Sequence, residues 1–329
     1  MEPCAPPPHK NRDDSAHKKK NSLANRQGAI LGMAIQPGKT GAPDSAGHGV
    51  RVARRETEAL TSPIQLHLWE HRSLFLGAIP EPVEFTPACG WLLVGLDSPF
   101  GIAVNDGPRV STRLALIPPG AEVRYQPEGG LVACCFLDVL GRDYRALAPR
   151  MQPVNDGLHH DDGALADALV RGFRQLDAEP VEPAGVYDRL VSLLQLPSPE
   201  PEGRIQQAVA GVVASVRLTA AANHPNSHYA AEAGLSEEVL SRWFRQETGL
   251  TLRRYRNWHR LFLAAWMMQM GVSLTVAAQE SGFSDAAHFN HVFREMVGLK
   301  PSFIQRALGM TRIFFAGHPV TLSATGEAY

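Results

Sequence analysis

The sequence predicts an α+β multidomain protein, with a strand-rich N-terminal domain followed by an all-helical C-terminal domain. Three observations support this prediction. Short apolar runs separated by turn residues extend over residues 63–138. Three prolines within residues 197–201 then form a linker. Residues 204–309 carry apolar side chains at helical spacing.

Composition sets the broad class of the protein. The chain has 329 residues, of which 44% are hydrophobic and 20% charged, as in ordinary soluble proteins. It has no apolar run of membrane-spanning length, and its polar, proline-rich N-terminus lacks the apolar core of a signal peptide. We therefore expect a cytoplasmic protein. Cys134 and Cys135 lie inside an apolar run, which predicts buried thiols.

Charge divides the chain into three parts. Residues 1–60 hold 10 Lys/Arg and 6 Asp/Glu, a net charge of +4. Residues 61–202 hold 10 and 19, a net −9, and residues 203–329 hold 12 and 8, a net +4. A basic end joined to an acidic middle suggests a nucleic-acid-binding module attached to a domain with another role. Residues 1–60 show no sustained apolar period and are expected to be a disordered tail.

Residues 61–142 are expected to fold as a small β-barrel or sandwich. Turn signals rich in Asp, Asn, Gly and Pro separate its apolar runs. The predicted strands are Leu74–Leu76, Trp91–Leu96, Gly101–Val104, Leu114–Ile117 and Leu131–Leu137.

Residues 143–202 are expected to form a helical dimerisation or linker segment. Helical spacing predicts two helices, Ala164–Leu176 and Val186–Leu196. Two roles are open for them, because they would either cover the barrel or form the seam of a dimer. Residues 310–329 follow the last helical pattern, and no role is assigned to them.

A helix-turn-helix pattern begins at Ala230. This small residue precedes Gly234 by four positions, and Ser236 is a good N-cap for the helix that follows. The apolar residues of that helix fall on one face, which must pack inward. The residues left on the outer face are Glu238, Ser241, Arg242 and Arg245. In this motif the outer face of the second helix reaches base edges in DNA.

The same pattern then recurs. Ala278 and Gly282 repeat Ala230 and Gly234 at a distance of 48 residues, whereas the end of the second helix repeats at 49. The segment from Thr251 to Met270 contains no Gly or Pro and predicts one connecting helix, about 30 Å long. Neighbouring major-groove faces on one side of DNA lie about 34 Å apart. This helix would therefore place two recognition helices in adjacent grooves.

Residues 203–303 resemble the DNA-binding domain of AraC/XylS-type bacterial regulators. The matching motifs are Ala230-x3-Gly-Leu-Ser236, Leu240-Ser-Arg-x-Phe-Arg245, Glu247-Thr-Gly-Leu250, Arg260-Leu-x2-Ala264, Gly282-Phe-Ser-Asp285, His288-Phe289, Phe293-Arg294 and Gly298-x-x-Pro301. The resemblance implies a double helix-turn-helix domain over residues 203–309 that binds double-stranded DNA. It also implies a transcription regulator that works as a homodimer and, as an activator, contacts RNA polymerase.

The resemblance also implies which side chains contact DNA. They are Glu238, Ser241, Arg242, Arg245, Ala286, Asn290, His291 and Arg294. His291 stands where the family usually has Arg, so a bidentate guanine contact is expected to be missing. Glu237 and Glu238 put negative charge near the DNA. Asn226 occupies a position that is usually apolar, so we expect a less stable first hairpin.

Residues 61–142 resemble the cupin-like sensor barrels that precede this DNA-binding domain in many family members. Leu116-Ile-Pro-Pro-Gly120 matches a common turn, and Trp91–Phe100 resembles the preceding strand. Metal-binding cupins carry histidines in two stretches that correspond here to Thr86–Gly90 and Ala121–Tyr125, and neither contains one. We therefore assign no metal and no cofactor, and expect no enzyme activity. The predicted fold is a cupin-like β-barrel with two following helices and an all-α domain of two helix-turn-helix motifs.

A small-molecule effector is expected to bind inside the barrel and to act on a dimer through the two helices. The aromatic residues proposed for this pocket, which serve equally well as core, are Trp69, Trp91, Phe100, Tyr125 and Phe136. Two other functions stay open. One is a cupin-type enzyme with an accessory helical domain, which a stoichiometric bound metal would favour. The other is a degenerate regulator that no longer reads DNA.

Overall fold

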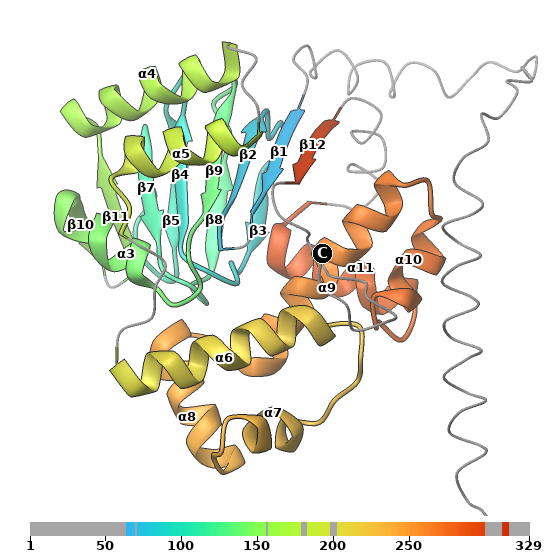
Figure 1. Ribbon diagram of the computed structural model, residues 1–329. Coiled ribbons are helices and arrows are strands. Elements are labelled where there is room, and N and C mark those ends of the chain that lie inside the picture. The colour runs from blue at the N-terminus through green and yellow to red at the C-terminus, as the bar shows by residue number, and fades with distance from the viewer. Residues whose placement is uncertain are drawn as a thin grey trace, which may run out of the picture. The chain divides into compact units, whose positions relative to one another are not determined.

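The computed structural model describes residues 64–69, 71–155, 157–178, 183–197, 203–299 and 311–315. The tail predicted over residues 1–60 lies outside them. Strands make up most of the part up to Asp161, and from Ala164 to Val297 all the elements are helices (Figure 1). The α+β organisation predicted from the sequence is therefore confirmed. None of the described helices has the length and hydropathy needed to cross a membrane.

The β domain consists of two sheets. The larger has eight strands in the order β10-β11-β7-β4-β9-β2-β1-β12, and the smaller has four in the order β3-β8-β5-β6. The strands of the larger sheet are β1 (Ile64–Leu68), β2 (Ser73–Gly77), β4 (Trp91–Gly95), β7 (Leu114–Ile117), β9 (Val132–Phe136), β10 (Gln152–Asn155), β11 (Leu158–Asp161) and β12 (Thr311–Phe315). Those of the smaller sheet are β3 (Val83–Phe85), β5 (Phe100–Val104), β6 (Val110–Thr112) and β8 (Val123–Gln126). Both sheets end in edge strands among the described residues, so the β-rich domain that we predicted is present, but these strands do not show a closed barrel.

The central strands of the larger sheet are buried on both faces. In β4, Leu92 belongs to a core shared with helices, whereas its neighbour Leu93 belongs to a core shared with the smaller sheet. In β9, Cys134 and Cys135 divide between the same two cores, and burial raises the pKa of both thiols. The prediction of buried thiols is confirmed. Two-sided burial explains why these strands are continuous apolar runs in the sequence.

Helices cover the outer face of the larger sheet (Figure 1). They are α3 (Arg142–Leu147), the short 3-10 helix η1 (Ala148–Arg150), α4 (Ala164–Ala178) and α5 (Pro183–Leu194). Phe173 of α4 and Leu190 of α5 share one core with Leu92 and Leu116 of the sheet. Of the two roles left open for these helices, covering the sheet is the one their packing shows. The expected helical segment over residues 143–202 also contains β10 and β11, and β11 pairs with β7 in the sheet.

A buried ion pair holds the start of the linker between the domains. The Arg72 guanidinium donates to both carboxylate oxygens of Asp143, at 2.7 and 2.8 Å. It also donates to the Tyr187 hydroxyl at 2.5 Å and to the Pro197 carbonyl at 3.1 Å. Arg72 and Asp143 are 4% and 0% exposed, so this charge pair is strongly desolvated and depends on its full set of partners. The chain therefore leaves the β domain from a fixed position.

The helical domain has six described helices around one core. They are α6 (Gly203–Thr219), α7 (Asn226–Glu232), α8 (Glu237–Thr248), α9 (Leu252–Gln269), α10 (Leu274–Glu280) and α11 (Ala286–Val297). The core contains Tyr229, Phe244 and Phe289, and also Ala88 and Cys89 from the β domain. The connecting helix predicted over Thr251 to Met270 is α9, with Thr251 as its N-cap.

The chain returns to the β domain after the helices. The backbone of β12 pairs in parallel with β1, from Ile64 opposite Thr311 to Leu68 opposite Phe315. On its other side β1 pairs antiparallel with β2. Part of the C-terminal segment for which the sequence suggested no role is therefore a strand at the edge of the larger sheet.

Candidate nucleic-acid interface

The two helix-turn-helix units have matching dimensions. Helices α7 and α10 have 7 residues each, and α8 and α11 have 12 each. The turns contain Gly234 and Gly282, with φ of 63° and 93°. Such positive φ angles suit glycine, since a β-carbon would clash with the backbone. The predicted duplication is confirmed as two equivalent structural units.

The recognition helices begin at equivalent N-caps. The Ser236 hydroxyl accepts from the Val239 N–H at 3.3 Å, and the Asp285 carboxylate accepts from the His288 N–H at 2.8 Å. These hydrogen bonds satisfy backbone donors that the first turn of a helix leaves free. Ser236 and Asp285 are 49 residues apart, whereas the turn glycines are 48 apart. The extra residue of the second unit therefore lies between its turn glycine and its N-cap.

The recognition helices also end alike. Gly249 and Gly298 are the C-caps, with φ of 73° and 81°. Their N–H groups donate to the carbonyls of Arg245 and Arg294, in both cases at 2.9 Å. A left-handed glycine in this position is a common way to stop a helix. Both helices are thus fixed at their two ends by equivalent residues.

The expected DNA-contacting residues mostly lie on the exposed faces of α8 and α11. The exposed ones are Glu238, Ser241, Arg242, Arg245, His291 and Arg294, and the half-buried ones are Ala286 and Asn290. At a distance of 49 residues, six of the eight fall into pairs: Ser241 with Asn290, Arg242 with His291, and Arg245 with Arg294. The other two do not pair, since Ala286 corresponds to Glu237. The two outer faces therefore carry different chemistry at similar positions.

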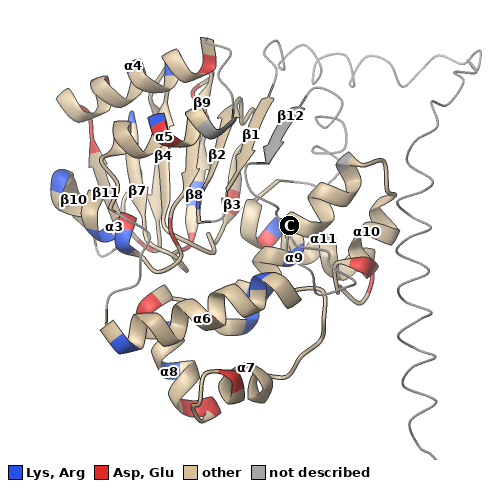
Figure 2. Cartoon of the chain, in the orientation of Figure 1, with Lys and Arg blue, Asp and Glu red and all other residues tan. Residues whose placement is uncertain are grey.

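Two glutamates occupy the first turn of α8. Glu237 and Glu238 are both exposed, and the ribbon is coloured red for acidic residues where α8 begins (Figure 2). Carboxylates at this end of a helix interact favourably with the free backbone N–H groups. This placement gives the two acids a role in stabilising α8 that does not involve DNA.

The arginines of the connecting helix have mainly structural partners. Arg260 is 4% exposed, and its guanidinium donates to the carbonyls of Ala220 and Ala222 at 2.7 and 3.3 Å. It also donates to Oδ1 of Asn223 at 2.8 Å. Burial lowers the pKa of Arg260 to about 10. The spacing of residues along the sequence alone gives no sign that this arginine is buried.

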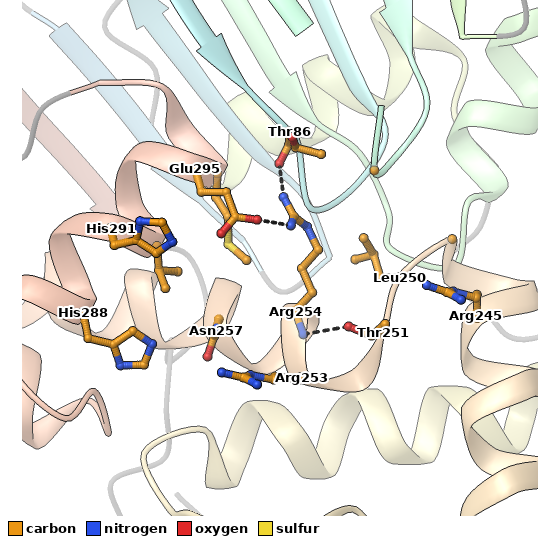
Figure 3. A pocket seen from close by; sticks show the side chains of 14 residues that line it. Thr86, Arg245, Leu250, Thr251, Arg253, Arg254, Asn257, His288, His291 and Glu295 are labelled. Carbon is orange, nitrogen blue, oxygen red and sulfur yellow. Dashed lines mark hydrogen bonds and ion pairs between the residues drawn. The ribbon is translucent and has the colours of Figure 1, made fainter. Parts of the chain in front are cut away.

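A half-open cavity of about 450 Å³ lies between the C-terminal end of α8, the first turns of α9 and the length of α11. Its wall includes Arg245 of α8, Arg253 and Arg254 of α9, and His288 and His291 of α11 (Figure 3). Loops of the β domain complete the wall. The cavity therefore joins the expected DNA-contacting surface to the β domain.

The aromatic residues expected in an effector pocket occupy several places. The ring centroids of Phe100 and Tyr125 lie 5.7 Å apart between the two sheets, and those of Trp91 and Phe85 lie 4.7 Å apart. Phe136 contacts Trp258 of α9, with ring centroids 5.0 Å apart. Trp69 lies 5.3 Å from Tyr187 and packs against the core under the helices. Four of the five side chains thus belong to the core between the sheets or pack against it, whereas Trp69 lies on the other face of the larger sheet. The pocket stays a prediction.

The first unit contains the residue that suggested a weaker scaffold. Asn226 is the first residue of α7 and is half-buried. Tyr229 and Ala230, which follow it in the same helix, are 0% and 2% exposed. The inward face of α7 is therefore apolar from Tyr229 onward, and Asn226 stands at its end.

Comparison with known proteins assigns this domain. A family model described as a helix-turn-helix domain matches residues 229–307. The HTH-type transcriptional activator RhaR of Escherichia coli (strain K12) is 36% identical over 72 residues, which are 22% of this chain and 26% of RhaR. RhaR of Shigella flexneri serotype 5b (strain 8401) gives the same values. The chain thus covers about a quarter of the length of these relatives. Residues 229–307 therefore match a helix-turn-helix domain, as the motifs predicted.

Solved structures give more distant matches. ToxT from Vibrio cholerae O395 is 14% identical, with a TM-score of 0.47, and the match covers 72% of this chain and 97% of ToxT. A probable AraC family transcriptional regulator from Rhodopseudomonas palustris CGA009 is 25% identical, with a TM-score of 0.30. That match covers 31% of this chain and 97% of the other.

Proposed function

We propose that this protein is a transcription regulator that binds two adjacent major grooves of double-stranded DNA with each subunit. One observation carries the proposal: α8 and α11 have equal lengths, equivalent caps at both ends and exposed faces whose polar residues align in pairs. The 18-residue helix α9 connects the two units. At 1.5 Å per residue it is about 27 Å long, which suits the spacing of about 34 Å between groove faces.

The β domain has the role of a sensor in this proposal. It precedes the DNA-binding domain, and we propose that it is a cupin-like domain that binds a small-molecule effector and takes part in a homodimer. We propose no enzyme activity for this domain. An activator of this kind contacts RNA polymerase, and its work on the chromosome places it in the cytoplasm.

Binding of the full chain to promoter fragments tests the proposal. We expect binding that weakens steeply as salt rises, because phosphate contacts release counterions. Arg242→Ala combined with Asn290→Ala should reduce binding to the preferred fragment, because each variant changes one recognition helix. Arg171→Ala, in an exposed position on α4, is the control and should leave binding unchanged. Unchanged binding of the double variant would show that the two helices do not contact bases.

A further inference from the structure

The β domain touches both recognition helices at their C-terminal glycines. A β-carbon built on Gly249 would lie 2.8 Å from Cγ of Pro119. A β-carbon built on Gly298 would lie 3.0 Å from Cβ of Val83 and 3.1 Å from Cδ1 of Phe85. Side chains of the β domain therefore pack directly onto the backbone at both caps. Because Gly249 and Gly298 are equivalent residues, one domain contacts the two units at the same place.

We propose that the β domain is a brace that holds the two recognition helices at one spacing. The proposal rests on the proposed DNA-binding function and names how that function is regulated. Helix α9 fixes the separation of the two units along its axis, and both units pack on it in the shared core. Contacts from the β domain to both caps would add a second connection between the units, outside that core.

Hydrogen bonds join the brace to both α9 and α11. The Thr86 N–H donates to the Glu295 carbonyl at 2.8 Å, so the residue that directly follows β3 is bonded to the backbone of α11. The Arg254 guanidinium donates to the Thr86 carbonyl at 2.6 Å and pairs with the Glu295 carboxylate (Figure 3). Arg254 therefore connects the helix between the two units, the second recognition helix and the β domain in one group.

An apolar contact supports the same interface. The rings of Phe136 in β9 and Trp258 in α9 lie 5.0 Å apart, and Trp258 is 8% exposed. Ala88 and Cys89, from the loop after β3, belong to the core of the helical domain. The contact between the domains is therefore apolar and buried at its centre, as the cores of protein interfaces are.

Two other glycines of the helical domain provide a comparison. Gly234 and Gly271 have φ of 63° and 84°, close to those of the caps. A β-carbon built on either would have no atom within 4 Å apart from those of the glycine and its two chain neighbours. Alanine at these positions would strain the backbone as it does at the caps, without disturbing the β domain. They are matched controls for Gly249 and Gly298.

The brace explains how a change in the β domain would reach DNA. Val83 and Phe85 lie in β3, and Pro119 lies in the turn after β7. A ligand that shifts β3 relative to this turn alters both caps together. The spacing of the recognition helices would then change without any rearrangement inside either unit.

Hydrogen exchange at the Thr86 amide tests whether the brace is closed. The full-length protein should protect this amide, and Gly249→Ala and Gly298→Ala should each speed its exchange at least tenfold. Gly234→Ala and Gly271→Ala should leave it as in the wild type. Pro119→Ala is a further variant that removes the Gly249 contact without changing a helix. Rapid exchange in the wild type, or equal effects of all four glycine variants, would overturn the proposal.

The distance between two spin labels tests whether the brace sets the spacing. Gln246→Cys in α8 and Gln279→Cys in α10 are exposed sites for the labels, and Cys89, Cys134 and Cys135 are buried. Cys4→Ser removes the other thiol. We expect one narrow distance distribution in the wild type and a broad one with Gly249→Ala, Gly298→Ala or Pro119→Ala. The proposal would be overturned by a variant that speeds hydrogen exchange at the Thr86 amide but leaves the distance distribution between the labels unchanged. Neither measurement contains DNA, so failure of the DNA-binding function is seen separately.

Discussion

The Ser273 hydroxyl caps α10 by accepting from the Val276 N–H at 3.4 Å, whereas its counterpart Pro225, 48 residues earlier, stands before α7 without a side-chain cap. Of the two units, only the second therefore has a capping side chain on its first helix.

Ser273→Ala should lower the free energy of unfolding by about 1 kcal/mol, because the first turn of α10 loses a hydrogen-bond acceptor. Pro225→Ser should raise the same free energy by supplying an acceptor at the start of α7. Urea unfolding followed by circular dichroism measures both. No loss of stability in Ser273→Ala would show that water replaces the hydroxyl at no cost.

Arg260→Met should destabilise the helical domain by about 3 kcal/mol, since buried acceptors of its guanidinium lose their donor. Arg260→Lys should rescue only part of this loss, because an ammonium group cannot reach the three acceptors in the same geometry. The control is Arg253→Met, an exposed position on the same helix, which should change stability by less than about 0.5 kcal/mol. Comparable losses at both positions would contradict a structural role specific to Arg260.

His291→Arg should strengthen binding to the preferred promoter fragment, because it gives α11 the arginine that α8 has at Arg242. A bidentate contact to guanine contributes about 1–3 kcal/mol of discrimination against other bases. Arg242→Ala should weaken binding by a similar amount. Fluorescence anisotropy with labelled duplexes at several salt concentrations measures both, since a base contact changes affinity with little effect on the salt dependence. Equal effects on unrelated duplexes would assign both positions to phosphate contacts.

Acid should destabilise the helical domain as the pH falls below about 6.5, where a histidine in the unfolded chain binds a proton. Burial lowers the pKa of His259 to about 3, so the folded state stays unprotonated over the same range. The contribution of His259 to the free energy of unfolding is thus fully present above about pH 6.5, and it is lost as the pH falls from about 6.5 to about 3. His259→Gln should flatten the dependence of the unfolding free energy on pH, whereas His291→Gln, at an exposed position, should not. A wild-type profile that is flat over this range would refute the assignment.

Ending the chain after residue 309 should expose the backbone of β1 and promote aggregation, because an unpaired strand edge can pair with another molecule. Ending it after residue 315 keeps β12 and is the matched control. Light scattering and hydrogen exchange of the β1 amides measure the difference. Ile313→Pro, which removes a backbone donor from β12, should show part of the same effect. Identical behaviour of the two truncated chains would show that the pairing does not matter for solubility.

The pattern of apolar residues along the sequence predicted those strands and helices in which the pattern is strong. The strand predicted at Leu114–Ile117 matches β7 residue for residue, because burial on both faces makes it wholly apolar. Ser236 was recognised as an N-cap from its position after the turn glycine. Strands with one exposed face were missed: β8 alternates between buried Val123 and exposed Arg124, which resembles a loop in so short a segment.

Contacts between distant segments left no trace in the sequence. Gly298 packs against Val83, more than two hundred residues earlier in the chain, and neither position has a neighbourhood that signals the contact. Arg254 and Arg260 are both arginines of the kind expected on a solvated helix face. Only the packing of α9 shows that Arg260 is the buried one. The sequence left a barrel and a sandwich open for a related reason, because strand order depends on pairings that periodicity does not encode.

The pairing of β12 with β1 has a consequence for protein engineering. A protein with this domain order can be cut at the linker to make chimaeras, in which the β domain of one protein is joined to the helical domain of another. Here a crossover near residue 200 would carry β12 away with the helices and replace it with whatever sequence the donor places there. The exchangeable module is therefore the helical domain without residues 311–315, inserted between two strands of the same sheet.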